Sequence, residues 1–142
     1  MNTVARAEDL SARVDWNLGD LEGARDCFTR SIEGFKALAL PWGHGNALVG
    51  MSGVPLESDD LDHAERLLAE ATSVLRHAGP WFQARALVVR ALVAVGRGNA
   101  DDALALMRDC LTRIRDVQDK YLFVHALVPL AAAAALKGRE VA

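Results

Sequence analysis

Three stretches of the chain place apolar or small residues three or four positions apart, with polar residues between them. They run over 21–35, 61–75 and 100–114. This spacing is typical of an amphipathic helix that buries one stripe of side chains. The stripes superimpose as small, large and small residues: Ala24, Phe28 and Ser31; Ala64, Leu68 and Ala71; Ala103, Met107 and Cys110. We expect the small positions to let a neighbouring helix approach closely and the large residue to fill the gap beside it.

A second type of helix precedes each of these stretches and carries a repeated triplet. Ala-Leu-Val occurs at 47–49, 86–88 and 126–128. An aromatic residue stands five positions before each alanine, and these residues are Trp42, Trp81 and Tyr121. The spacing of apolar residues predicts helices of this type over roughly 4–17, 43–54, 81–96 and 121–137. Pro41 and Pro80 suit helix starts, because a proline's missing N–H is not needed there.

Turn residues follow these helices at a constant interval. Gly19, Gly98 and Gly138 stand where a left-handed residue is expected after a helix, and Asp59 takes the equivalent place after the second one. The next helices begin with acids: Asp20, Asp60 and Asp101 lie in or near their first turns. There a carboxylate can accept backbone N–H bonds and meet the positive end of the helix dipole.

Both helix types recur every 39 or 40 residues, a period that indicates a repeat array. We therefore predict an all-α fold of helical hairpins in a superhelix, with about 3.5 repeats in a single domain over 1–142. The repeats run over about 4–40, 41–79, 80–119 and 120–142, and the last is incomplete. Residues 138–142 copy a turn and the start of another second helix. Natural arrays end in a polar capping helix, so we expect the chain to be a piece of a longer protein.

The spacing of these residues resembles the tetratricopeptide repeat, and the resemblance covers nearly the whole chain. That motif has a turn glycine, an alanine five positions later, then a large apolar residue and a small one. The matching sets are Gly19, Ala24, Phe28 and Ser31; Asp59, Ala64, Leu68 and Ala71; Gly98, Ala103, Met107 and Cys110; and, twelve positions before the alanines, Ala12, Ser52 and Ala91. Two features depart from the motif, namely a period longer than the usual 34 residues and Glu8 at an apolar position. HEAT-type repeats of about 40–47 residues are the competing assignment, but they lack the Gly-x4-Ala turn.

The longer period and the Ala/Leu/Arg-rich segments 18–25 and 64–71 resemble one subgroup in particular. They are similar to the repeat region of bacterial regulators of the LuxR/MalT type, in which an ATPase switch module precedes the repeats. The chain has no phosphate-binding loop and no basic recognition helix. The resemblance therefore implies a regulatory context, without ATP or DNA binding by these residues.

In tetratricopeptide arrays the first helix of each hairpin lines a concave groove that binds peptides or partner segments. The resemblance places these residues on the groove: Asn46, Val49 and Gly53; Arg85, Val88 and Leu92; His125, Val128 and Ala132. The alternative is that further repeats of a parent protein, or another copy of the chain, cover this surface.

The predicted helix 43–54 contains four glycines, Gly43, Gly45, Gly50 and Gly53, and Pro55 follows it. Each interior glycine costs about 0.5–1 kcal/mol relative to alanine, and Pro55 would clash with the Met51 carbonyl if the helix continued. We expect a short helix, the least stable of its type. It is either a hinge or a helix packed closely against a neighbour. Pro129 is expected to kink the last helix or to mark a start near residue 128.

Composition restricts the function further. A net charge of -3 argues against a nucleic-acid-binding module. Cys27 and Cys110 lack metal-ligand spacing and suit reduced thiols in the cytoplasm. The longest apolar run, 127–136, is too short to cross a bilayer. No histidine cluster, nucleophile motif or complete calcium loop is present in the sequence, so we expect no catalytic residue, metal or cofactor.

These observations favour a non-catalytic protein-interaction module of a bacterial signalling or transcription regulator. The expected partners are a peptide or helix in the groove, or other domains of a parent chain. An exposed apolar helix at 121–137 predicts a homo-oligomer. The alternative function is a sensor that binds a small-molecule inducer in the groove.

Overall fold

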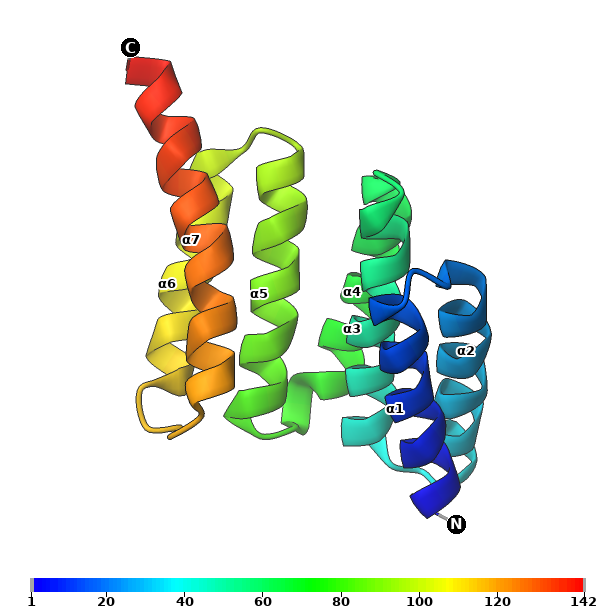
Figure 1. Cartoon of the computed structure of the whole chain (residues 1–142). Helices are drawn as coiled ribbons and strands as arrows, with labels where there is room; N and C mark the ends of the chain where they lie inside the picture. The colour runs from blue at the N-terminus through cyan, green and yellow to red at the C-terminus, as the bar shows by residue number, and fades with distance from the viewer. Residues whose placement is uncertain (1, 142) are drawn as a thin grey trace. The chain divides into compact units, whose positions relative to one another are not determined.

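The structure is a computed structural model that describes residues 2–141, and every regular element in that range is helical (Figure 1). The elements are α1 (Asn2–Asn17), α2 (Leu21–Ala37), α3 (Pro41–Glu57), α4 (Leu61–Val74), the short 3-10 helix η1 (Leu75–His77), α5 (Pro80–Gly96), α6 (Ala100–Ile114) and α7 (Lys120–Val141). The all-α prediction is confirmed for this range. Contacts divide the chain into two compact units: unit 1 ends at Ala78 and unit 2 begins at Gly79. This boundary lies one residue before the expected repeat boundary at 79–80, while the single-domain prediction stays a prediction.

Unit 1 consists of two helix hairpins, α1–α2 and α3–α4, and α2 also packs against α3. Its core cluster joins Ala12 of α1, Ala24 and Phe28 of α2, and Val54 of α3. Phe28 is completely buried. The predicted small and large positions of the stripe therefore lie in the core of this unit.

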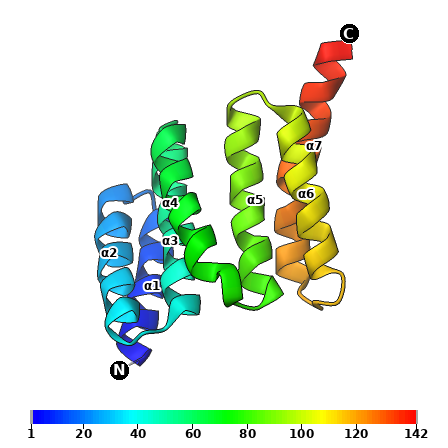
Figure 2. The same cartoon turned by 180° about the vertical axis from the view of Figure 1, so that it is seen from behind.

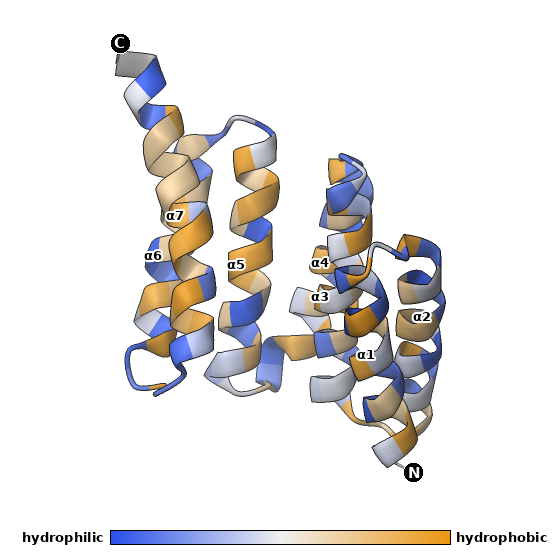
Figure 3. Ribbon diagram, viewed as in Figure 1, coloured by the Kyte–Doolittle hydropathy of each residue, from blue (hydrophilic) through white to orange (hydrophobic). Residues whose placement is uncertain are grey.

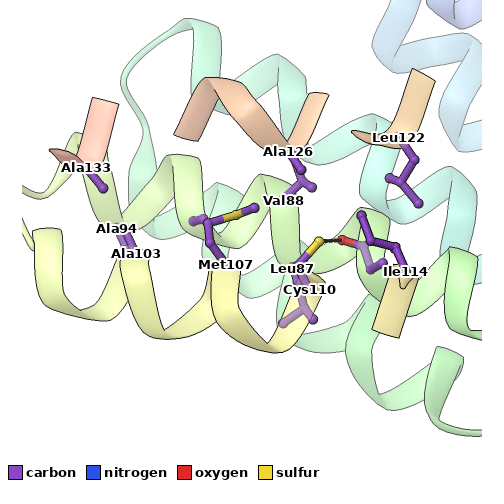
Figure 4. Packing of buried hydrophobic residues seen from close by; sticks show 12 residues of the cluster. Leu87, Val88, Ala94, Ala103, Met107, Cys110, Ile114, Leu122, Ala126 and Ala133 are labelled. Carbon is purple, nitrogen blue, oxygen red and sulfur yellow. Dashed lines mark hydrogen bonds between the residues drawn. The ribbon is translucent and has the colours of Figure 1, made fainter. Parts of the chain in front are cut away.

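Unit 2 consists of α5, α6 and α7, which contact one another pairwise and lie side by side in both views (Figures 1 and 2). Its core contains residues from all three helices (Figure 4): Ala84, Leu87, Val88, Ala91 and Ala94 of α5; Ala103, Met107, Cys110 and Ile114 of α6; Leu122, Ala126 and Ala133 of α7. Alanine is frequent in this set, and its small side chain lets the helices pack closely.

Left-handed residues close the hairpin turns where the sequence predicts them. Gly19 and Gly98 have φ values of 85° and 72°, and Asp59 adopts 59°. Ala39, between α2 and α3, also has a positive φ of 51°, which the sequence pattern does not predict. Glycine and aspartate tolerate this conformation better than alanine does.

Short polar side chains cap the second helix of each hairpin. The Asp20 carboxylate accepts the Gly23 N–H at 2.9 Å, and the Asp60 carboxylate accepts the His63 N–H at 3.1 Å. In α6 the cap is Asn99. Asp101 lies in the first turn of α6, as predicted, near the positive end of the helix dipole.

The prediction that the glycine-rich helix is short is wrong. Helix α3 has 17 residues, as many as α5, and it continues through Pro55 to Glu57. A Cβ at Gly43 would overlap Phe35, and one at Gly50 would overlap Phe28. The glycines therefore let α2 approach the α3 backbone, and this packing offsets their low helix propensity.

The predicted turn at Gly138 is also wrong. Helix α7 continues through Gly138 to Val141 and also includes Pro129, so it does not start near residue 128. It starts at Lys120 because the Asp119 carboxylate accepts the N–H groups of Tyr121 and Leu122 at 2.9 and 3.1 Å. The Trp81 side chain donates to the other oxygen of Asp119. This bond, with that of Leu122, keeps the pKa of Asp119 below its ordinary value.

Candidate interaction surface

One side of α7 packs into unit 2. Leu122, Ala126, Pro129 and Ala133 are buried, and they recur at intervals of four, three and four residues. This spacing places them on a single stripe of the helix. The stripe contacts α5 and α6 and holds α7 in the unit.

The opposite side of α7 is apolar and exposed. Tyr121, Phe123, Val124, Leu127 and Val128 have exposed fractions of 82, 52, 58, 46 and 58%. Three exposed alanines continue this surface toward the C-terminal end of the helix: Ala131, Ala134 and Ala135. We call these eight residues the α7 face. No Asp, Glu, Lys or Arg occurs between residues 121 and 136, and Figure 3 shows most of the helix in apolar colours.

The repeat register shows what covers the same surface elsewhere. Forty residues before the α7 face, α5 places Ala84, Leu87, Ala91 and Ala94 in one core cluster with Ala103, Met107 and Cys110 of α6. In Figure 4, Leu87 lies beside Cys110, and Ala94 lies beside Ala103. The α7 counterparts are Val124, Leu127, Ala131 and Ala134. The surface that α6 covers on α5 is therefore uncovered on α7.

Two equivalent hydrogen bonds show how closely the paired helices approach. Ser31 Oγ of α2 donates to the Ala5 carbonyl of α1 at 2.9 Å. Cys110 Sγ of α6 donates to the Ala84 carbonyl of α5 at 3.5 Å. In both cases a small residue of the second helix meets a small residue of the first, at the same repeat position. On α7 that position holds Val124, a bulkier residue.

The structure places the sequence-predicted groove residues in different surroundings. Val49 and Val88 are buried, with exposed fractions of 2 and 6%, and Gly53 is also buried. His125 and Val128 are exposed on α7. The remaining residues are half-buried: Asn46, Arg85, Leu92 and Ala132. Binding in a concave groove stays a prediction, and the buried valines lack the accessible surface that such a site needs.

The exposed residues Tyr121, Phe123, Val124 and Leu127 were not among the predicted groove residues. The sequence predicts an exposed apolar helix over 121–137, but the groove register did not identify which of its residues form the exposed side. The available signal was the absence of charge on every side of the helix. An amphipathic surface helix normally carries charged residues on its outer side.

A polar cluster in unit 1 is a second candidate site. Arg30 of α2 contacts Cys27 Sγ at 3.0 Å and pairs with Glu8 of α1 at 3.0 Å, and Cys27 donates to Asp15 at 3.6 Å. Arg30 lowers the pKa of Glu8, whereas burial and the Asp15 contact raise the pKa of Cys27. A raised pKa disfavours the thiolate that a cysteine nucleophile requires. The cluster therefore serves to join α1 to α2, with Glu8 satisfied by Arg30 at its apolar repeat position.

Two further searches bear on the kind of site. Among the described residues, no group of three or more His, Cys, Asp or Glu side chains is placed to hold a metal ion. Residues Lys120–Arg139 of α7 are long and apolar enough to cross a membrane by length and composition alone. One such helix is weak evidence for a membrane span.

We compared the chain with protein-family models, curated proteins and solved structures, and none of the three comparisons gave a match.

Proposed function

We propose that the chain is a non-catalytic helical-repeat module that binds other proteins. Within this proposal its hairpins form a tetratricopeptide-like superhelix, in the cytoplasm, as part of a bacterial regulator of the LuxR/MalT type. The recurrence of the small-to-small helix contact in both units supports the repeat assignment. The regulatory context rests on the sequence resemblance.

The α7 face is the observation on which this function depends. Five large apolar side chains are exposed together on one helix, while the counterpart surface of α5 is packed against α6. Contiguous exposed apolar patches commonly mark protein-interaction sites. Because covering the patch removes apolar surface from water, association is favourable.

Static light scattering tests the proposal in solution. Without another partner, we expect the chain to self-associate through the α7 face into a dimer or larger species. Leu127→Lys combined with Val128→Lys should give a monomer, because two charges would then have to be desolvated in the contact. As a matched control, Ala105→Lys with Thr112→Lys adds the same charge to exposed positions of α6 and should leave the mass unchanged. A wild-type chain that remains monomeric at high concentration would contradict self-association.

A thermal-shift screen separates this module from an inducer sensor. Sugars and nucleotides should leave the melting temperature unchanged if the chain binds only proteins. A ligand that binds only the folded state raises the apparent stability, and the increase grows with the logarithm of the ligand concentration relative to its Kd. A strong shift by one compound would favour the sensor.

A further inference from the structure

We propose that the α7 face binds an amphipathic partner helix of the same kind as α2, α4 and α6, with a residue no larger than alanine opposite Val124. This inference rests on the proposed function and names the chemistry of the partner. The inference has two parts. The first concerns the shape of the partner helix, and the second concerns the size of its residue opposite Val124.

The shape of the occupant follows from the α5–α6 interface. Four residues of the α7 face, Leu127, Val128, Ala131 and Ala134, are identical to their α5 counterparts: Leu87, Val88, Ala91 and Ala94. All four α5 residues belong to a core cluster that contains residues of both α6 and α7. Two of them, Leu87 and Ala94, lie beside Cys110 and Ala103 of α6 (Figure 4). Because the same side chains at the same helical spacing present the same surface, the α7 face is complementary to a helix with the stripe of α6. Such a helix would extend the α5–α6–α7 packing by one element.

Helix α6 presents an apolar stripe to the core and carries its charges on its other sides. It contributes Ala103, Met107, Cys110 and Ile114 to the shared core, while Asp102, Arg108 and Asp109 on its other sides are exposed. Because the α7 face carries no charge from Tyr121 to Ala135, a charge inside the partner's stripe would be buried without an opposite charge. The partner must therefore be amphipathic, with its charges outside the contact.

Val124 sets the size limit. The counterpart positions hold Ala5 in α1, Gly45 in α3 and Ala84 in α5. At Ala84 the contacting residue is Cys110, whose sulfur lies 3.5 Å from the Ala84 carbonyl oxygen. The bulkier Val124 occupies space that a cysteine uses in the α5–α6 contact. A partner helix can approach as closely only if it presents glycine or alanine there.

A second copy of α7 fits this description less well. At the positions of the small–large–small stripe, α7 offers Val124, Val128 and Ala131. The first small residue of the stripe, Ala64 in α4 and Ala103 in α6, is replaced in that series by the bulkier Val124. Self-association through this face is therefore expected to be weaker than binding of a helix with the α4 stripe, which has Ala71 opposite Val124.

The chain itself supplies suitable peptides for the test. Residues 59–77 contain α4 with its capping Asp60, and Ala71 stands at the position equivalent to Cys110. The matched control peptide carries Ala71→Leu, because leucine nearly equals alanine in helix propensity. We would measure binding of each labelled peptide by fluorescence anisotropy to the full chain and to its Val124→Ala variant.

The four affinities form a double-mutant cycle. The wild-type chain should bind the Ala71 peptide roughly tenfold more tightly than the Ala71→Leu peptide, because overpacking a close contact is destabilising. Val124→Ala should reduce that preference to about threefold or less, because the two sites couple only when they touch. Leu127→Lys with Val128→Lys should abolish binding of both peptides.

The other outcomes separate this inference from the proposed function. Equal binding of both peptides to the wild-type chain, abolished by the lysine pair, would overturn the size limit and leave the protein-interaction function intact. Self-association that neither peptide reduces would show a second copy on the face. Flotation with phosphatidylcholine–phosphatidylglycerol vesicles, lost in the lysine pair, would show a lipid surface there. Each of these last two results would overturn the proposal that the partner is an amphipathic helix. Binding unaffected by the lysine pair would contradict the proposed function itself.

Discussion

Gly50 and Gly138 both lie inside helices, but their surroundings differ. A Cβ at Gly50 would overlap the Phe28 ring, whereas nothing lies within 4 Å of a Cβ at Gly138. Gly50→Ala should lower the free energy of unfolding by about 1–3 kcal/mol through overpacking. Gly138→Ala should raise it by up to about 0.5 kcal/mol through helix propensity. Urea unfolding measures the change in the free energy of unfolding for each variant. An equal change at the two sites would contradict the packing role of Gly50.

Cys110 gives a pH dependence of stability. Burial raises the pKa of its thiol from the ordinary 9.0 to about 11. The folded state therefore keeps the thiol protonated, and stability is complete below pH 9.0 and declines as pH rises toward about 11. At pH 10 the loss should be on the order of 1 kcal/mol.

Urea unfolding at pH 8 and pH 10 measures this loss, with Cys110→Ala as the control. The variant lacks the titrating thiol, so its stability should decline less between the two pH values. Identical declines in both proteins would show that the thiol is as ionisable in the folded state as in the unfolded state.

At the scale of the element, the question is whether α3 is a hinge or a closely packed helix. Residues of α3 are buried along most of its length, including Ala47, Leu48 and Val49 at the centre. Amide exchange slows with burial and contact density. The amides of residues 47–54 should therefore exchange as slowly as those of 86–94 in α5. Hydrogen exchange measures both, and much faster exchange in α3 would support the hinge hypothesis.

Helix α7 shows why pattern alone misassigned a boundary. The expected turn residue Gly138 lies inside the helix, which continues to Val141. Lys137 pairs with Asp101 of α6 at 2.6 Å, which holds this end of α7 against α6. Glycine lowers helix propensity but does not by itself end a helix. At Pro55 the contacts of α3 outweigh the one backbone hydrogen bond that proline cannot donate.

At the scale of the whole molecule, the two units have separate core clusters. Phe28 lies at the centre of the unit 1 cluster, and Met107 lies in the unit 2 cluster. Phe28→Ala should cost about 3–5 kcal/mol and Met107→Ala about 2–5 kcal/mol. Hydrogen exchange should accelerate first in the unit that carries the substitution, because local opening follows the contacts that are lost. Equal acceleration in both units after either substitution would show that they open as one.

The sequence by itself determined that the chain forms helices, the three hairpin turns between them, and the repeat. Periodic apolar residues, left-handed Gly19, Asp59 and Gly98, and the caps Asp20 and Asp60 act within a few residues of themselves, so their effects can be predicted locally. Only the tertiary structure decided which apolar residues are buried. Val88 and Val128 occupy equivalent positions of identical triplets, yet their exposed fractions are 6 and 58%. Burial depends on whether a second helix covers the residue, and that helix lies outside the local sequence that defines the pattern.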